Sequence, residues 1–383
     1  MHRDVRSLAS TKWTLVFAAF IVLLFAVLTV WIYHKWSRPK HYEPPVLESF
    51  QLHQYDQFGN AIKDAYDSPN AIALTPDGRT LVIGSGSGVT LWDISSGNKT
   101  VLFDGQPGLS LVFSPDGTAL ATRGYNGRIR LWDWNQKKEL ASFAAAASEG
   151  DHASAHSMAF TVDGKALVST GKGKTPTPGL VAVTGGFGEV DLWSIPAGEK
   201  QRTLTGHSNY VHSVALSPDG ATLASADEDG NLKLWDTTTW QVRSSWKGKV
   251  ETQGYGKQLL SIAFSADSKV LAAGAIFEVQ LWDVASGKLT GTLHEDRGFI
   301  QSVAFSPDGK TLAAACRGSQ AILGTEPGRT YIWNLEGGKG RSIWWNPDPY
   351  KWVSWVVFSP DNKTLVTTTG TFVRRWDVSA IPW

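Results

Sequence analysis

One stretch of this chain brings together residue types that bind metals in proteins. Asp151, His152 and His156 lie within six residues and offer one carboxylate and two imidazoles. Zinc takes such ligands, but the spacing His-x-x-x-His places both rings on one face only when the segment is a helix. The surrounding sequence, AAAASEGDHASAH, is typical of a loop. We therefore interpret the three side chains as loop residues and keep a metal site as the alternative.

Two other patterns resemble known catalytic motifs but each lacks a required residue. Gly173-Lys174-Thr175 could end a phosphate-binding loop, yet Val168 stands where that motif needs glycine. The stretch Gly84–Gly88 reads GSGSG, so glycine occupies the position of the nucleophile in G-x-S-x-G. No pair of carboxylates can be defended as an acid and a base either. We expect no cofactor and no enzymatic activity.

A sequence repeat predicts the secondary structure to which these residues belong. A tryptophan followed by Asp, Ser or Asn recurs at intervals of 40 to 61 residues, and a short turn with a central Asp precedes each one. The tryptophans are Trp92, Trp132, Trp193, Trp235, Trp282, Trp333 and Trp376, and the turn residues are Asp77, Asp116, Asp163, Asp219, Asp267, Asp308 and Asp361. Periods near forty residues with a recurring Trp-Asp pair indicate a β-propeller. Short alternating apolar runs between the turns predict the strands.

Composition and charge narrow the class of partner. The chain has 383 residues and a formal net charge of +1, and 42% of its residues are hydrophobic. Six of its Lys and Arg residues lie within the first 41 positions beside a single acid, so the remainder is net negative. Neutralising nucleic-acid phosphates requires the opposite sign, and we expect no nucleic-acid partner. The single cysteine, Cys316, cannot form an internal disulfide and is interpreted as a small buried apolar residue.

The N-terminal segment predicts a membrane anchor. Residues 13–33 contain no charge, and as a helix they would span roughly 32 Å, about the thickness of the hydrocarbon layer. Aromatic residues flank the segment, and no small-x-small cleavage site follows it. We predict a basic tail (1–12), a single transmembrane signal anchor (13–33), a linker (34–45) and a repeat domain (46–383). Flanking Lys and Arg are equal in number, so orientation rests on the short tail staying in the cytoplasm, with the repeat domain extracytoplasmic; the cytoplasmic face is the alternative.

In its repeated Trp-Asp pairs and Asp-containing turns, the chain resembles the WD-repeat β-propeller family over about residues 46–383. The resemblance implies an all-β fold of seven four-stranded blades. The last Trp-Asp pair is followed by only six residues, so the seventh blade lacks an outer strand. We expect Val46–Gln54 to supply it and to close the ring. The resemblance also implies a structural hydrogen-bond network, complete only in the fourth repeat, made by His207, Ser225, Asp229 and Trp235.

Repeat lengths vary in a way that points to a binding face. From turn Asp to Trp the spacing is 15 or 16 residues, except in repeats three and six, where it is 30 and 25. The inserts, 171–188 and 317–329, lie between second and third strands and share one rim with the loops that enter each repeat. The loop entering repeat seven is rich in aromatic residues. The candidate partner-binding residues are Trp344, Trp345, Tyr350, Phe187, Tyr255 and Arg317.

Two functions fit these observations. The first is a membrane-anchored scaffold that binds a protein or peptide through the loop-rich face, which is what the family resemblance implies. The second is an enzyme, small-ligand or metal binder at the mouth of the central channel. Its polar candidates are Asp151, His152, His156, Glu295 and Asp296.

Overall fold

The computed structural model describes strands and turns of the repeat domain. The described residues are 40–41, 46–51, 69–86, 88–104, 110–124, 127–144, 157–161, 166–169, 187–247, 258–317, 320–321, 324–325, 328–343, 353–370 and 372–381. The chain divides into two compact units, Met1–Lys40 and His41–Trp383. Within the described ranges no helix is long and apolar enough to cross a membrane. The predicted anchor, residues 13–33, lies outside them and stays a prediction.

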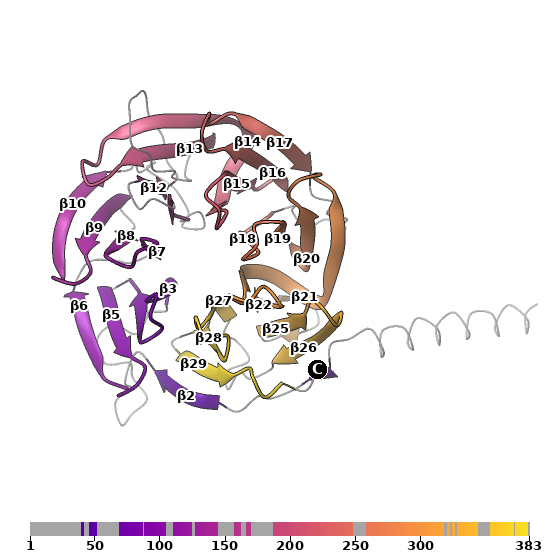
Figure 1. Cartoon of the computed structure of the whole chain (residues 1–383). Helices are drawn as coiled ribbons and strands as arrows, with labels where there is room; N and C mark the ends of the chain where they lie inside the picture. The colour runs from indigo at the N-terminus through magenta and orange to yellow at the C-terminus, as the bar shows by residue number, and fades with distance from the viewer. Residues whose placement is uncertain are drawn as a thin grey trace, which may run out of the picture. The chain divides into compact units, whose positions relative to one another are not determined.

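The fold is all-β and propeller-like, with sheets arranged around a central axis (Figure 1). Two sheets have four strands consecutive in sequence and antiparallel. They are β3 (Ala71–Leu74), β4 (Thr80–Gly84), β5 (Gly88–Asp93) and β6 (Lys99–Asp104), then β7 (Ser110–Phe113), β8 (Ala119–Arg123), β9 (Arg128–Asp133) and β10 (Lys138–Ala144). In each sheet the first strand in sequence lies nearest the axis (Figure 1).

Two longer sheets arise because a single strand serves two neighbours. One contains β11 (Ala159–Phe160), β12 (Ala166–Ser169), β13 (Phe187–Ser194), β14 (Lys200–Leu216), β15 (Thr222–Asp227), β16 (Asn231–Asp236) and β17 (Val242–Lys247). The other contains β18 (Ser261–Phe264), β19 (Val270–Gly274), β20 (Ile276–Asp283), β21 (Leu289–Phe305), β22 (Thr311–Arg317), β25 (Arg329–Asn334) and β26 (Lys339–Ile343). The first part of β14 pairs with β13 and its last part with β15. β21 does the same between β20 and β22.

The two ends of the repeat domain meet in one sheet, as predicted. β2 (Val46–Gln51) pairs antiparallel with β29 (Phe372–Asp377), which follows β28 (Thr364–Thr369) and β27 (Val353–Phe358). The pairing supplies the outer strand that the C-terminal repeat lacks. β1 (Lys40–His41) is a two-residue strand at the boundary of the two units.

The Asp-containing turns have one geometry wherever they are described. In each, the Ser or Thr before the turn donates its hydroxyl to the turn Asp, as Ser306 does to Asp308 at 2.6 Å. The fourth position has a positive φ and is Gly, except for Ser268 and Asn362. Asp163 lies outside the described residues. The described turns lie where the sequence predicts them. The hydroxyl and the carboxylate stabilise each turn because they bond backbone groups that would otherwise need water.

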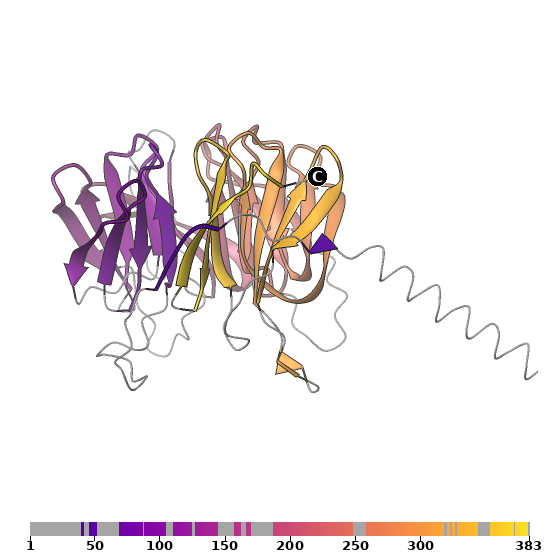
Figure 2. The same cartoon turned by 90° about the horizontal axis from the view of Figure 1, so that it is seen from below.

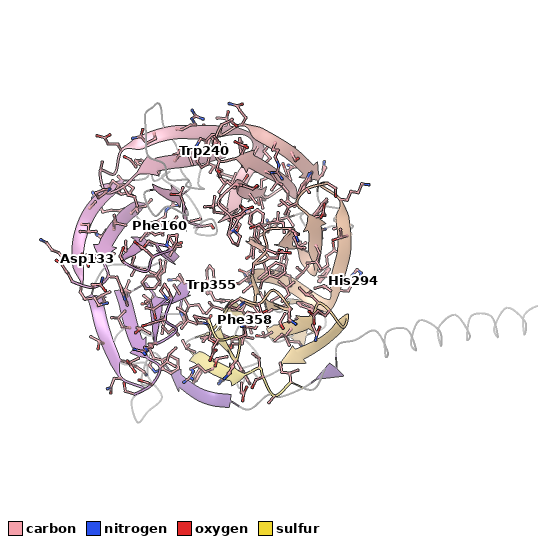
Figure 3. The ribbon with its side chains drawn as sticks, viewed as in Figure 1. Asp133, Phe160, Trp240, His294, Trp355 and Phe358 are labelled. Atoms are coloured by element: carbon pink, nitrogen blue, oxygen red, sulfur yellow. The ribbon has the colours of Figure 1, made fainter. Side chains whose placement is uncertain are left out.

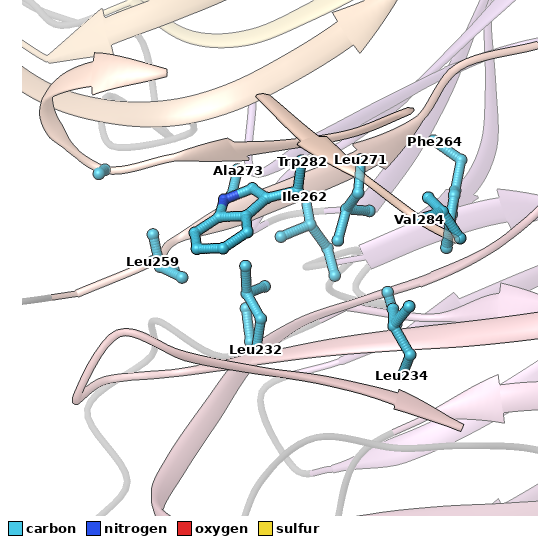
Figure 4. Packing of buried hydrophobic residues seen from close by; sticks show 12 residues of the cluster. Leu232, Leu234, Leu259, Ile262, Phe264, Leu271, Ala273, Trp282 and Val284 are labelled. Atoms are coloured by element: carbon cyan, nitrogen blue, oxygen red, sulfur yellow. The ribbon is translucent and has the colours of Figure 1, made fainter. Parts of the chain in front are cut away.

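Buried apolar residues fill the space between neighbouring sheets. The largest cluster joins Leu232 and Leu234 of β16 with Leu259 and with residues of β18–β20, among them Trp282 (Figure 4). Its members are at most 8% exposed. Alternation along each strand sends successive side chains to opposite neighbours, so each four-stranded sheet contributes to two clusters and each longer sheet to three. This packing supplies most of the stabilising free energy and fixes the rims on which binding residues can sit.

Candidate interaction rim and the His207 network

The best-defined polar site lies inside the sheet formed by β14–β17. His207 Nδ1 lies 2.9 Å from Asp227 Oδ2, and its Nε2 lies 2.6 Å from Ser225 Oγ. Trp235 Nε1 donates to the same Ser225 Oγ at 2.8 Å. An ionised carboxylate only accepts, so His207 donates through Nδ1 and accepts the Ser225 hydroxyl at Nε2. The chain of donors runs from Trp235 through Ser225 and His207 to Asp227.

Three residues of the predicted network, His207, Ser225 and Trp235, are joined by these bonds, and the acid bonded to His207 is Asp227, whereas the sequence analysis named Asp229. Asp227 is the last residue of β15 and is fully buried, so its side chain faces His207 across the sheet. Asp229 lies two residues later in the turn and receives Ser208 Oγ and Asn209 Nδ2 at 3.2 and 3.3 Å. The acid bonded to His207 is the last residue of β15, whereas the family resemblance points to the turn that follows this strand.

Electrostatics support an ionised Asp227. Burial alone would raise its pKa, but hydrogen bonds from His207 and Asn231 outweigh burial and hold the pKa below its ordinary value. Asn231 contributes both its side-chain amide and its backbone N–H, each at 2.8 Å. The turn after β15 is thus tied to the incoming segment of β14 through one carboxylate.

The order Asp, His, Ser is also the order of a hydrolase triad, but the surroundings do not allow that chemistry. In a triad the serine oxygen must reach a substrate and face an oxyanion hole. Here Ser225 is 0% exposed, and the indole of Trp235 occupies its oxygen. The group works as a clamp that holds β14, β15 and β16 together.

Elsewhere only part of the network recurs. Trp132 donates to Thr122 at 3.0 Å, and Trp376 donates to Thr367 at 2.8 Å. Other repeats hold their tryptophan by stacking: Trp282 lies against Trp246 with ring centroids 5.4 Å apart, and Trp333 lies against Tyr331 at 5.8 Å. The tryptophan is thus a packing residue in each of these settings.

The candidate partner-binding residues lie at or beyond the edge of the described part. Trp344, Trp345, Tyr350 and Tyr255 are outside it, and so are Asp151, His152 and His156. Among described residues no group of three potential ligands could hold a metal. Phe187 begins β13, where its backbone pairs with Tyr210. Glu295 and Asp296 fall within β21.

Arg317 ends β22 at the start of the repeat-six insert. Its backbone pairs with Phe299, and its side chain is half-buried, which lowers the pKa of the guanidinium from its ordinary value. Immediately after it the insert forms a hairpin, β23 (Gln320–Ala321) with β24 (Gly324–Thr325). This hairpin projects beyond the rim (Figure 2). The structure thus places Arg317 at the base of a projecting hairpin.

Polar pairs among the described residues border the same rim. Gln258 donates to Glu228 at 2.9 Å, and His294 Nδ1 lies 3.8 Å from Glu278 Oε2. His294 is labelled on the outer side of the ring in Figure 3. Glu228 lies on the turn between β15 and β16, Gln258 lies on the segment that enters β18, Glu278 lies near the start of β20, and His294 lies in the part of β21 paired with it, so all four lie toward the rim of the inserts.

Fold and site together define a β-propeller-like protein whose buried polar cluster is structural. Three segments match the family described as WD domain, G-beta repeat: residues 99–133, 198–236 and 287–323. Over these segments the chain is similar to WD40 repeat proteins.

Curated relatives match over the repeats. Periodic tryptophan protein 2 of Arabidopsis thaliana is 26% identical over 263 residues, covering 66% of this chain and 27% of that protein. WD repeat-containing protein 1 of Xenopus tropicalis is 23% identical, covering 57% and 41%. WD repeat-containing protein 90 of Mus musculus is 24% identical, covering 61% and 12%. The chain matches less than half the length of each.

Proposed function

We propose that this chain is a non-catalytic WD-repeat platform that binds a protein or peptide through the insert-bearing rim. WD-repeat proteins generally act as scaffolds for protein interactions. The observation that carries the proposal is the contrast between the two rims. On one rim an insert forms the projecting hairpin β23–β24, and on the other the Asp turns repeat one compact geometry. Loops that differ on a uniform scaffold are where recognition residues are expected.

We also infer seven blades of four strands for the ring. Support comes from the inner strands β3, β7, β11, β14, β18, β21 and β27, each of which opens a hairpin and contacts the next one. On this view β14 and β21 each form the outer strand of one blade and the inner strand of the next. β2 completes the last blade.

The absence of catalysis is part of the proposal. Its support is the burial of the Asp227–His207–Ser225 group, the one described cluster with the residue types of a nucleophilic site. The net negative repeat region argues against a nucleic-acid partner. No cofactor is proposed.

Membrane attachment through residues 13–33, with the platform extracytoplasmic, is a further proposal that rests on sequence. It predicts that the full chain stays in the membrane fraction at alkaline pH, whereas a chain starting at residue 41 does not. Protease added to spheroplasts should degrade the platform. Complete protection from protease would contradict the predicted orientation. Release of the full chain at alkaline pH would contradict the predicted anchor.

The binding proposal is tested by altering each rim in turn. One variant replaces 318–328 by Asn-Gly, and a second replaces 345–350 by a Gly-Ser linker of equal length. The control carries Thr118→Ala and Lys310→Ala on the opposite rim, where both residues are exposed. Partners are captured by crosslinking in cells and quantified by mass spectrometry, with thermal unfolding as the check on folding. We expect partner loss in both rim variants and retention in the control; retention in all three contradicts the proposal.

A further inference from the structure

Serine side chains link consecutive inner strands around part of the ring. The oxygens of Ser157, Ser213, Ser261 and Ser302 accept the backbone N–H groups of Val214, Ile262, Val303 and Val356 at 3.2, 3.1, 3.1 and 3.4 Å. Each serine stands four positions before its turn Ser or Thr, and each acceptor contact crosses to the next inner strand. We call these contacts serine staples. They run without a break from β11 through β14, β18 and β21 to β27.

The stapled N–H groups are those that the hairpin itself leaves unused. In the β18–β19 hairpin, Ser265 N–H bonds the carbonyl of Val270. Hydrogen-bonded pairs alternate along an antiparallel ladder, so Ala263 is bonded to its partner while the N–H of Ile262 points away from it. A buried backbone donor without an acceptor destabilises the fold, and the serine of the preceding strand satisfies it.

The remaining three junctions lack this link. At the same position β27 has Trp355 and β3 has Ala71, neither of which offers an oxygen acceptor. β7 has Ser110, but within the described ranges no bond joins it to Met158 of the next segment. The three junctions are consecutive, from β27 through β3 and β7 to β11. The ring is thus divided into a stapled arc and an unstapled arc.

Apolar contact replaces the staple where the ring closes. Trp355 is half-buried, packs on the cluster that contains Ile72 and Val366, and lies toward the central opening (Figure 3). Such contact has no preferred direction, so it holds two strands together without fixing their register. The same arc includes the sheet that is completed by β2, which is held to β29 by strand pairing.

We propose that the unstapled arc is a conformational seam of the ring: its hairpins open locally before those of the stapled arc. The opening unit comprises β2, β3–β6 and β7–β10. Local opening is expected where fewer specific contacts hold an element, and it needs no unfolding of the rest. The inference is independent of partner binding.

Amide hydrogen exchange under native conditions tests the seam at matched positions. Ala73 and Val112 on the unstapled arc correspond to Ala263 and Ala304 on the stapled arc: each lies two residues before its turn Ser or Thr, is half-buried and is bonded within its hairpin. We expect protection factors, corrected for intrinsic rates, to be lower for Ala73 and Val112 by about fivefold or more, the factor for one typical net hydrogen bond. Equal protection at all four positions overturns the proposal.

Two substitutions test whether the staple is the cause. Ser261→Ala removes the acceptor of Val303 N–H and should lower the protection of Ala304 about fivefold. Ala71→Ser offers an acceptor to the next strand and should raise the protection of Val112. If Ser261→Ala folds and leaves Ala304 as protected as before, the staples do not set local stability and the seam is rejected. Ser286→Ala, in the exposed turn between β20 and β21, is the control substitution.

Discussion

Asp227 contributes more to the stability of the fold than Asp229, which lies two positions later in the turn. It accepts four hydrogen bonds, from His207, from Asn231 twice and from the backbone of Asp229. Removing its carboxylate leaves the buried His207 donor without a partner, which costs far more than an exposed turn contact.

The first prediction compares the two aspartates. Asp227→Ala should lower the free energy of unfolding by about 2 to 4 kcal/mol, and Asp229→Ala by less than about 1 kcal/mol. Urea unfolding monitored by tryptophan fluorescence measures both. Equal losses of stability would contradict the assignment of the stabilising role to Asp227 rather than to Asp229.

A second residue-scale prediction concerns pH. Asp191 is fully buried, with Lys200 Nζ at 2.7 Å and Thr203 Oγ1 at 2.6 Å; burial raises its pKa to about 6, and these two partners oppose that rise. The folded pKa exceeds the ordinary 3.8, so the folded chain binds more protons between these values and stability falls as pH rises through 6. The difference in unfolding free energy between wild type and Asp191→Asn should move against wild type by about 3 kcal/mol from pH 3.5 to pH 7. A difference that does not change with pH would contradict the shift.

At the scale of elements, the Asp turns are tied to one another as well as to their own strands. A Cβ on Gly117 would lie 2.9 Å from Pro76 in the neighbouring turn, and one on Gly78 would lie 2.9 Å from Pro360. Asp219 N–H donates to Ser268 Oγ, and Asp308 N–H donates to Asn362 Oδ1. In each pair the fourth residue of one turn meets the second or third residue of the turn before it. These contacts explain why this rim keeps one loop length.

Substitution of two glycines distinguishes the cost of backbone strain from the cost of the contact between neighbouring turns. Gly117 and Gly309 have φ near +70°, but the nearest atom to a Cβ on Gly309 is 4.0 Å away. Gly309→Ala should cost about 1 kcal/mol from the positive φ alone. Gly117→Ala should cost at least about 1 kcal/mol more, because Pro76 must move. Chemical denaturation of both variants measures the difference, and equal costs would show that the turns do not press on each other.

The repeat and its turns could be predicted from sequence because each unit carries its own local chemistry. The spacing of the repeats predicts Trp376 and the turn of Ser306 and Asp308. The missing outer strand of the last repeat predicts the pairing of β2 with β29. The serines of the staples recur four positions before the turns and can be found in the sequence. Their bonds could not be predicted, because these depend on which backbone N–H faces the neighbouring strand. Asp227 could not be separated from Asp229 because the choice depends on where β15 ends. Trp344, Trp345, Tyr350 and Tyr255 fall outside the described residues, so their role stays a prediction.

At the scale of the whole molecule, the ring depends on a strand taken from the opposite end of the repeat domain. Without β2, the edge of β29 would expose unpaired backbone groups. Deleting residues 46–51 should lower the unfolding midpoint, broaden the transition and promote association in size-exclusion chromatography. The same deletion with a six-residue strand peptide, VLESFQ, added in solution should partly restore the midpoint. An unchanged midpoint after deletion would show that β2 is dispensable.

Partners are proposed to bind the rim that carries the inserts, and crosslinking at single positions tests this most directly. Photo-crosslinking residues placed at Glu228 and His294 report on that rim, and residues placed at Thr118 and Lys310 report on the opposite one; Glu228 is half-buried and the other three sites are exposed. Irradiation in cells followed by mass spectrometry gives the partner yield at each site. Specific partner adducts should form at Glu228 or His294 and be absent at Thr118 and Lys310. Adducts confined to Thr118 and Lys310 would contradict the proposal.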